Sequence, residues 1–412
     1  IAAPLCRSYY ESQGGKFGKE FKTEDANRTY GTGPDHIAYC GPYLVTNATA
    51  NNTIVFQASP SYWNADKINV KTLTWVFQDG SEVTKTYTDL KSGVVDGASL
   101  NSSTIKMARD EGLFDEYVYT SATDATSYYA SFNLARLMFH NYNDPAKLVS
   151  TQSHGSVDEI LAARKNGEEA NTSDIEDDAA RTHIAVNNRH FRLAMIMALD
   201  RGDWNAQIYS DELKFNPMRN TYVPGTFVHI ENEVTVDVNG TPTTFPAGTQ
   251  YGEIVQAQIT ADGLPIKVWD TSTGAEDPST GFDGWYNLNA AKEQFELAKQ
   301  ELAAVGVEVS AENPIQIDFP FAGQDERYAN RAQVFVKCMN EAFGGEIQIN
   351  LLEGASFQEM NDSSYFPESG AEMNFDYTMA FGWGPDWGDP NSYLDQILPY
   401  GEGFMQKGFG LW

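Results

Sequence analysis

Residues 383–389 contain two tryptophans and two aspartates, Trp383, Asp386, Trp387 and Asp389. Glycines and prolines separate them, which disfavours a helix or a strand and predicts a shaped loop. An indole face attracts a cation, and a poorly hydrated carboxylate holds one tightly. The loop therefore suits a ligand with an apolar body and a cationic end. The alternative is a tight turn whose tryptophans pack in the core.

The two aspartates also raise the question of catalysis, because paired carboxylates serve as acid and base in glycosidases. Such pairs usually come from different elements, whereas Asp386 and Asp389 lie on one loop. Asp389 is followed by proline and by the run NSYLDQIL, so we expect it to cap a helix that begins there. The sequence has no G-x-S-x-G or H-E-x-x-H motif. We therefore predict that the chain is not an enzyme.

Cysteine and histidine are too scattered to predict a metal site. The three cysteines are Cys6, Cys40 and Cys338, and the sequence has no Cys-x-x-Cys or His-x-x-x-His spacing. We expect no metal and no other cofactor. Either Cys6 and Cys40 pair in an oxidising compartment, or all three are isolated thiols, since an odd number gives no disulfide framework.

The chain of 412 residues is acidic, with 57 acidic and 28 basic residues and a formal net charge of −29. This charge argues against binding to nucleic acid or to an anionic membrane surface. No run of about 18 apolar residues occurs, and no basic segment followed by an apolar run opens the chain. We expect a soluble protein of two or three domains. Because residue 1 is isoleucine, a removed leader or lipid anchor remains open.

The spacing of apolar residues in the C-terminal half predicts the elements that position the loop. These elements are a helix at 290–305, a strand at 315–319, a helix at 328–342, a strand at 347–351, a short helix from 355 and a strand at 375–381. Asn289 and Gly306 are the expected caps of the first helix. Strand, helix and strand make a βαβ unit with parallel strands. The loop then leaves the carboxyl end of a strand, where ligands of open α/β sheets bind.

The N-terminal third is predicted to be rich in strands, at 53–59, 70–78 and 128–134, with a helix at 83–93.

Three further features divide the rest of the chain. Residues 145–188 are polar and are predicted to be an inter-domain excursion or a surface insertion. Residues 189–205 are predicted to form one compact helix. Asn239-Gly240 predicts a β-hairpin insertion within 230–252. We place a domain boundary near 135–145.

Six segments occur in an order that carries a resemblance to a known family: CGPYLVTN, ASPSYWN, LKSGVVDGA, YYASFNL, FRLAMIMALDR and GWGPDWGDPNSYLD. Each is weak alone, but together they resemble the extracellular solute-binding proteins of family 5, the oligopeptide- and dipeptide-binding type. Those proteins are the receptors of ATP-binding-cassette (ABC) peptide importers. The resemblance spans residues 38–398.

The resemblance implies an α/β, periplasmic-binding-protein-like fold of type II, or cluster C, with two lobes, mixed sheets and helices packed on them. Residues 1–140 would be an incomplete, β-rich part of lobe I, and 141–412 would be lobe II with insertions near 145–188 and 230–252. Family members usually carry further segments at both ends, so the chain resembles a middle fragment. The two predicted insertions depart from the simplest family pattern.

The resemblance also implies a mechanism, in which two lobes close on an extended peptide by a hinge motion. One aspartate of the second lobe holds the α-ammonium group of the peptide, and by motif position it is Asp386. Trp383 would be the wall beside it, and Trp387 stands where the family often has tyrosine. Gly382 and Gly384 complete the expected ligand loop.

Two further positions are candidates on the strand at 128–134. Asn133 would either contact ligand or hold the hinge. Of Tyr128 and Tyr129, one should be buried and the other should face the cleft. We name Tyr129 as the ligand contact.

The partners implied by the resemblance are a peptide and the membrane subunits of an ABC permease, with the chain as a monomer. Its place would be the outer face of the cytoplasmic membrane, by a lipid anchor, or the periplasm. Relatives with the same fold bind sugars, dipeptides or nickel complexes, so these ligands remain alternatives. A hydrolase is a less favoured alternative.

Overall fold

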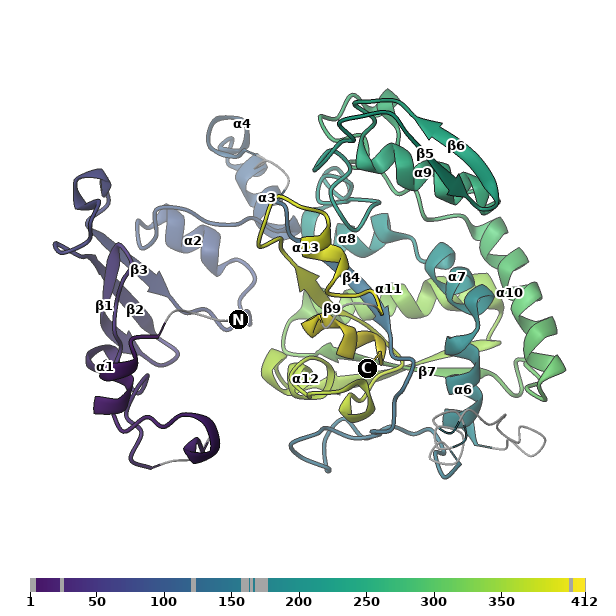
Figure 1. Ribbon diagram of the computed structural model, residues 1–412, viewed down its shortest axis with the longest axis horizontal. Coiled ribbons are helices and arrows are strands. Elements are labelled where there is room, and N and C mark those ends of the chain that lie inside the picture. The colour runs from purple at the N-terminus through teal and green to yellow at the C-terminus, as the bar shows by residue number, and fades with distance from the viewer. Residues whose placement is uncertain are drawn as a thin grey trace. The chain divides into compact units, whose positions relative to one another are not determined.

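The computed structural model describes residues 5–22, 26–119, 124–156, 163, 166, 177–399 and 403–411. The chain forms two compact units, Ile1–Glu82 and Val83–Trp412 (Figure 1). The compact units divide between residues 82 and 83, and the domain boundary that we place near 135–145 stays a prediction. The assignment of lobes, which concerns how a ligand is enclosed, remains a prediction.

The first unit is built on an antiparallel sheet of three strands in the order β1-β2-β3. The strands are β1 (Tyr43–Thr49), β2 (Thr53–Ala58) and β3 (Thr72–Val76), so the strands predicted at 53–59 and 70–78 are confirmed. A short helix, α1 (Arg7–Ser12), precedes the sheet. Tyr10 is the one buried hydrophobic residue in the described part of this unit.

The second unit opens with three helices and a strand: α2 (Lys85–Lys91), α3 (Ser102–Asp110), α4 (Phe114–Tyr117) and β4 (Ser127–Phe132). The helix predicted at 83–93 and the strand predicted at 128–134 are thus confirmed. Asn101 fixes the start of α3 with a capping box, in which its side chain and that of Thr104 each accept from the other's backbone.

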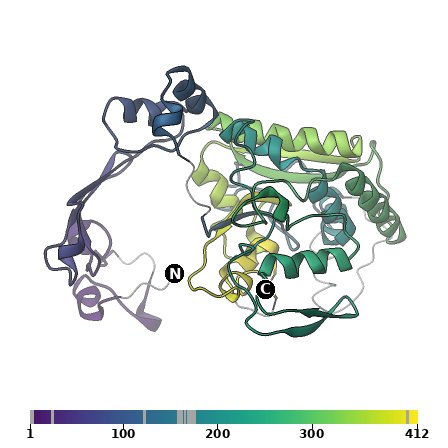
Figure 2. The ribbon, with the colours of Figure 1, turned by 90° about the horizontal axis from the view of Figure 1, so that it is seen from above.

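The predicted βαβ unit is confirmed in the second half of the chain. Strands β7 (Ile315–Ala322) and β8 (Ile347–Gly354) pair in parallel, with Ile315 opposite Ile347. The helix α11 (Glu326–Phe343) connects them, and Figure 2 shows it as a long light-green helix alongside the strands. It ends at Gly344, whose φ of 59° is left-handed and suits glycine.

The helix α10 (Leu288–Ala304) packs along α7 (Arg189–Ala198) and closes the main core. Its start is capped by Asn287, which accepts from the backbone of Ala290, and not by Asn289 as predicted. The two asparagines are only two residues apart, and the spacing of the apolar residues does not determine which of them caps the helix. The core itself consists of fully buried side chains from several helices and from β7, among them Phe191, Phe295, Leu302, Ile317 and Phe335.

Our prediction of one helix at 189–205 is wrong, because the chain breaks into α7 and α8 (Arg201–Tyr209). Leu199 is extended, and the Asp200 carboxylate accepts a hydrogen bond from the backbone of Asp203. A side chain that can cap a new helix competes with continuation of the old one. The break directs α8 toward α11 and α3.

The polar segment 145–188, predicted to be an inter-domain excursion or a surface insertion, contains a buried helix. Most of 157–176 lies outside the described residues, but the segment ends in α6 (Asp178–Asn187), which is buried on most sides. Ala185 and Val186 pack in the main core, and Ala180 is also fully buried. Small residues and buried hydrogen-bonded polar residues form this helix, so the apolar pattern that marks a buried helix is weak.

The predicted hairpin is confirmed as β5 (Val234–Val238) and β6 (Thr241–Phe245). Asn239 and Gly240 have φ values of 50° and 79°, as a two-residue turn of positive φ requires. In Figures 1 and 2 the hairpin lies beside α9 (Tyr251–Ala261).

The last elements are α12 (Phe357–Ser364), β9 (Tyr377–Trp383) and α13 (Asn391–Leu394). Strand β9 pairs antiparallel with β4, so the unit contains both parallel and antiparallel pairs. Short 3₁₀ helices lie at Gly18–Glu20, Pro34–His36, Ala65–Lys67, Thr271–Thr273, Gly370–Glu372 and Phe404–Phe409. No described helix is long and apolar enough to cross a membrane.

All three cysteines are free thiols. Cys6 and Cys40 are exposed and Cys338 is buried in α11, so the predicted alternative of isolated thiols is the one that the structure shows.

Candidate functional site

The loop that follows β9 is shaped by Ser392, a residue that the sequence analysis did not single out. Its hydroxyl oxygen accepts hydrogen bonds from the backbone N–H groups of Asp386 at 2.7 Å and Trp387 at 3.2 Å. Its carbonyl oxygen accepts from the indole Nε1 of Trp383 at 2.8 Å. Asp389 Oδ1 accepts from the backbone of Asn391, the first residue of α13, at 2.7 Å, so its side chain has a structural role at the start of this helix, although Pro390 and not Asp389 occupies the N-cap position.

Asp386 is an exposed residue of this loop. Within the described residues it makes no ion pair and accepts no hydrogen bond, although its backbone N–H is held by Ser392. In the described part of the chain, no side-chain interaction therefore ties Asp386 to its own turn. Its role toward a ligand remains a prediction.

The two tryptophans of the loop have different environments. Trp387 has 79% of its surface exposed, whereas Trp383 is partly buried and packs against a small core of Met373, Phe375, Phe381 and Met405. The packing role that we weighed as the alternative thus applies to Trp383, and Trp387 is the indole with a free face.

The glycines of the loop allow close contact with β4. A Cβ on Gly382 would come within 2.7 Å of Cδ1 of Tyr128, and a Cβ on Gly384 within 3.1 Å of the Thr126 hydroxyl. Strand β9 lies against β4 at this point, where Trp383 is the partner of Ser127. Both glycines therefore have a packing reason to be small, apart from any contact with ligand.

Tyr128 and Tyr129 alternate as predicted. Tyr128 is 82% exposed, and Tyr129 lies inward, stacked on Phe381 and Phe409 at centroid distances of 6.0 and 5.8 Å. Burial, followed by the neighbouring Tyr222, raises the pKa of Tyr129 well above its ordinary value. Tyr129 is therefore a neutral aromatic wall at physiological pH.

Asn133 is buried, with 1% of its surface exposed. Its Nδ2 donates to the carbonyl oxygens of Gly370 at 2.7 Å and Met373 at 3.3 Å, and its Oδ1 accepts from the backbone of Ala135 at 3.1 Å. Of its two predicted roles, the structural one fits this geometry, because the side chain joins the end of β4 to the segment before β9.

A cavity of about 2040 Å³ lies within the second unit. Its walls come from α3, α4, β4, α8, β7, α11, α12 and β9, and they include both Tyr128 and Tyr129. No sequence pattern predicted it, because its lining residues come from elements far apart in the chain. Trp383, Asp386 and Trp387 are not among its lining residues.

The candidate loop nevertheless begins at the edge of this cavity. Thr126 and Ser127 line the cavity and lie against Gly384 and Trp383 respectively. The Tyr393 hydroxyl after the loop donates to the carbonyl oxygen of Ala125 at 2.6 Å. A ligand group at the loop and another in the cavity would therefore contact neighbouring surfaces of one unit.

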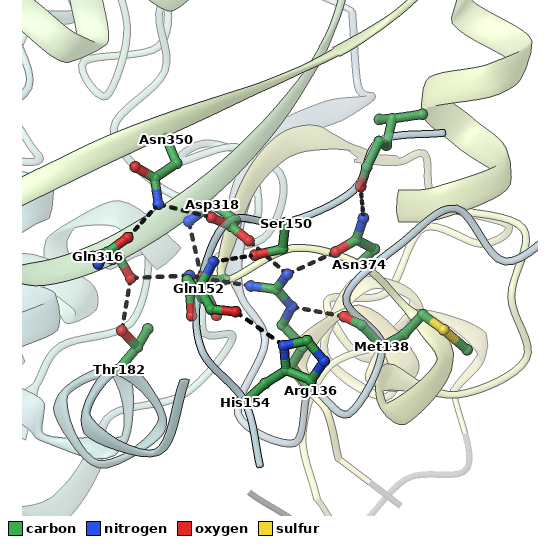
Figure 3. A network of polar contacts seen from close by, with 12 residues as sticks. Arg136, Met138, Ser150, Gln152, His154, Thr182, Gln316, Asp318, Asn350 and Asn374 are labelled. Atoms are coloured by element: carbon green, nitrogen blue, oxygen red, sulfur yellow. Dashed lines mark hydrogen bonds and ion pairs between the residues drawn. The ribbon is translucent and has the colours of Figure 1, made fainter. Parts of the chain in front are cut away.

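A buried network around Arg136 fixes the strands that carry the site (Figure 3). Nη2 of Arg136 donates to Asp318 Oδ2 at 2.6 Å, and Nη1 donates to Asp376 Oδ2 at 2.7 Å. Asp318 lies on β7 and Asp376 directly precedes β9, while Arg136 follows β4. One guanidinium group thus joins three strands.

Other polar groups complete this network. Nη2 of Arg136 also donates to Asn374 Oδ1 at 2.6 Å, and Gln152 Nε2 donates to Asp376 Oδ2 at 2.7 Å. Burial alone would raise the pKa of Asp318, but the charge and hydrogen bond of Arg136 hold it below its ordinary value. Burial raises the pKa of Asp376.

The described residues contain no group of three or more histidine, cysteine, aspartate or glutamate side chains that could hold a metal ion.

Comparison with known proteins places these features in a family. The model for "Bacterial extracellular solute-binding proteins, family 5 Middle" matches residues 4–404. The oligopeptide-binding protein AliB of Streptococcus pneumoniae is 28% identical over 412 residues, covering 99% of this chain and 52% of its own. SarA of Streptococcus gordonii, also named an oligopeptide-binding protein, is 25% identical over 98% of this chain and 50% of its own. The chain thus spans about half the length of these relatives.

Solved structures give the same fold. The substrate-binding domain of an oligopeptide ABC transporter from Bacillus anthracis matches with a TM-score of 0.57 at 13% identity, over 99% of this chain and 55% of its own. OppA of Listeria monocytogenes, solved with a bound peptide, matches with a TM-score of 0.55 at 15% identity, over 98% and 55%. At such identities the likeness shows the fold alone, and it confirms the predicted α/β fold of this class.

Proposed function

Because this chain belongs to the bacterial extracellular solute-binding proteins of family 5, we propose that it binds peptides for an ABC importer. The protein that contains it would capture an oligopeptide outside the cytoplasmic membrane and deliver it to the membrane subunits of a permease. Its relatives are named oligopeptide-binding proteins, and one structural neighbour was solved with a peptide. This family binds solutes and does not transform them, so the proposal includes no catalytic step.

The observation that carries the proposal is the exposed carboxylate of Asp386, which has no ion pair among the described residues and lies on a loop that begins at the edge of a large cavity. A carboxylate without a protein cation is a ready partner for an α-ammonium group, and charge-assisted hydrogen bonds are stronger than neutral ones. Trp387 offers an indole face next to it, and Tyr128 and Tyr129 line the neighbouring cavity. These groups match a ligand with a cationic end and a mixed polar and apolar body.

The remaining parts of the proposal concern the environment of the protein. We place it at the outer face of the cytoplasmic membrane, held by a lipid anchor, or in the periplasm, and we expect a monomer. The net charge of −29 disfavours nucleic acid as a partner.

A thermal-shift assay with a peptide mixture, oligosaccharides and nickel tests the ligand class. A ligand present at about 100 times its dissociation constant stabilises the folded state by about 2.7 kcal/mol. We expect the peptides to raise the melting temperature and the other two ligands to leave it unchanged. If oligosaccharides or nickel raise the melting temperature and peptides do not, the proposed ligand class changes from peptides to the ligand that gives the shift.

A further inference from the structure

Arg219 is a partly buried cation of the second unit that is bound by backbone groups and not by a carboxylate. It forms no ion pair with any residue that the structure describes, whereas Arg201 pairs with Asp283 at 2.6 Å. Burial lowers the pKa of the Arg219 guanidinium group below its ordinary value. A cation in a poorly solvating place is destabilising unless its donors are satisfied. The groups that satisfy Arg219 therefore show what it holds.

The acceptors of Arg219 are concentrated on the segment that leads into β4, residues 124–127. Its Nη1 donates to the carbonyl oxygen of Asp124 at 3.1 Å. Its Nη2 donates to the carbonyl oxygen of Thr126 at 3.2 Å and to the Ser127 hydroxyl. Hydrogen bonds from a charged donor are stronger than those from a neutral one. One guanidinium group thus fixes the path of this segment.

The same segment holds the helix that follows the candidate loop. The carbonyl oxygen of Ala125 accepts a hydrogen bond of 2.6 Å from the hydroxyl of Tyr393, which lies in α13. The Tyr393 side chain is completely buried, and its ring meets those of Tyr222 and Phe227 edge to face at 5.8 and 5.5 Å. Because Tyr393 is both packed and hydrogen-bonded, α13 is fixed relative to residues 124–127.

Ser392 extends these contacts to the candidate loop. It directly precedes Tyr393, and its hydroxyl oxygen accepts hydrogen bonds from the backbone N–H groups of Asp386 at 2.7 Å and Trp387 at 3.2 Å. A shift of α13 would therefore move the backbone that carries the Asp386 carboxylate. Among the described residues, no partner of this carboxylate would hold it in place instead.

We propose that Tyr393 and Arg219 are positioning residues, which act through Ser392 to set where the Asp386 carboxylate meets the cationic end of the ligand. The inference rests on the proposed function and assigns two further residues to its site. A hydrogen bond weakens as its distance and angle depart from their preferred values. A carboxylate that is held in place beforehand also loses less freedom when the ligand arrives.

The position of the clamped segment supports this role. Asp124, Thr126 and Ser127 line the cavity, and the Thr126 hydroxyl lies against Gly384 of the candidate loop. The segment that Arg219 fixes therefore belongs to the wall of the cavity and to the support of the loop. A ligand that occupies both meets surfaces held by one set of hydrogen bonds.

The test measures how strongly each variant prefers a peptide with a free amino terminus over the same peptide with an acetylated one. Tyr393→Phe removes the hydroxyl and keeps the buried ring. The ratio of the two dissociation constants, from titration calorimetry on the full chain, should fall by about three- to tenfold, as expected for the loss of one hydrogen bond. Affinity for the acetylated peptide should stay nearly unchanged. A merely structural role would weaken both peptides equally and leave the ratio as it is.

Two other variants test the beginning of the path and its specificity. Arg219→Lys keeps the charge but loses the planar fork that reaches two carbonyl groups, so it should also lower the ratio. Tyr39→Phe is the matched control in the first unit, because the Tyr39 hydroxyl donates to the carbonyl oxygen of Pro34 at 2.9 Å. It should keep the wild-type ratio. An unchanged ratio in Tyr393→Phe, or an equal fall in Tyr39→Phe, would overturn the inference.

Amide hydrogen exchange distinguishes failure of this inference from failure of the proposed function, because it needs no ligand. Mass spectrometry follows a fragment that contains Asp386 and Trp387. Its exchange should be faster in Tyr393→Phe than in the wild type by about three- to tenfold, and unchanged in Tyr39→Phe. If exchange responds in this way but the wild type binds no peptide, the peptide function fails and the positioning path stands. If exchange does not respond to Tyr393→Phe, the path is overturned.

Discussion

The two compact units of this chain differ in how completely they bury their apolar side chains. The described part of the first unit has one buried hydrophobic residue, Tyr10, while Trp63 is 83% exposed and Trp75 is 64% exposed. The second unit buries side chains such as Phe191, Phe335 and Ile315 completely. Burial of apolar surface is the main source of folding free energy. The second unit therefore has a core that can support a site, and the first unit has little of its own.

The same difference in burial determines which ion pairs contribute to the stability of each unit. In the second unit a buried cation, Arg136, holds two buried carboxylates, so removal of one partner leaves charges in a medium that solvates them poorly. Among the described residues of the first unit, the ion pair of Arg7 and Glu11 is 77% and 47% exposed. Such exposed pairs contribute little.

The largest expected effect comes from Arg136. Replacement of Arg136 by leucine should lower the free energy of unfolding by about 3–5 kcal/mol, because Asp318 and Asp376 stay buried without their cation. Urea unfolding monitored by tryptophan fluorescence measures it. Arg189→Leu is the matched control, since its pair with Asp262 is exposed, and it should cost less than about 1 kcal/mol. Equal losses in the two variants would show that the network does not hold the unit together.

Truncation of apolar side chains should separate the two units next. Leu302→Ala in α10 removes a side chain that is 1% exposed and should cost about 3 kcal/mol. Val70→Ala in the first unit changes a residue that is 52% exposed and should stay within about 0.5 kcal/mol. Leu297→Ala is the control on α10, because Leu297 is 41% exposed. If Val70→Ala lowers the free energy of unfolding as much as Leu302→Ala does, the proposed difference between the units is wrong, because Val70 would then have to belong to a buried core.

A smaller effect should appear at alkaline pH in the second unit. Burial, with smaller effects of nearby groups, raises the pKa of Tyr222 to about 12 from an ordinary value of 10.0. The unfolded chain loses this proton near pH 10 while the folded chain keeps it, so stability present below pH 10 is lost as pH rises toward 12. Tyr222→Phe should reduce this loss in chemical unfolding between pH 9 and 11. An identical pH dependence in wild type and variant would contradict the raised pKa.

The sequence predicts those parts of the second unit whose apolar residues repeat regularly. The helices at α10 and α11, the strands β7 and β8, and the turn at Asn239-Gly240 follow from local period and turn chemistry. The sequence did not reveal the break between α7 and α8. The apolar residues keep their helical spacing across it, and only the capping side chain of Asp200 marks it. Helix α6 was missed because its buried side chains are small or polar.

The candidate site is less predictable than the fold. The motif around Asp386 indicates the loop, but not that Ser392 shapes it or that Trp383 packs inward. Asn133 directly follows a recognisable strand, yet its hydrogen bonds to Gly370 and Met373 depend on tertiary structure. Cavities arise from distant segments, and no sequence window contains them.

We propose that Asp386 holds the positive end of the ligand, on the loop that begins at the edge of the cavity of the second unit. The most direct measurement is the ratio of dissociation constants for one peptide with a free and with an acetylated amino terminus. The wild type should prefer the free form by about tenfold or more, since a hydrogen bond to a charged group is worth about 1.5–3 kcal/mol. In Asp386→Asn the ratio should approach one.

Asp389→Asn is the control, because it removes an equal charge from the same loop while asparagine can still accept from the backbone of Asn391. It should keep the wild-type ratio. A wild type that binds both peptide forms equally, or an Asp386→Asn variant that keeps the full preference, would contradict the account.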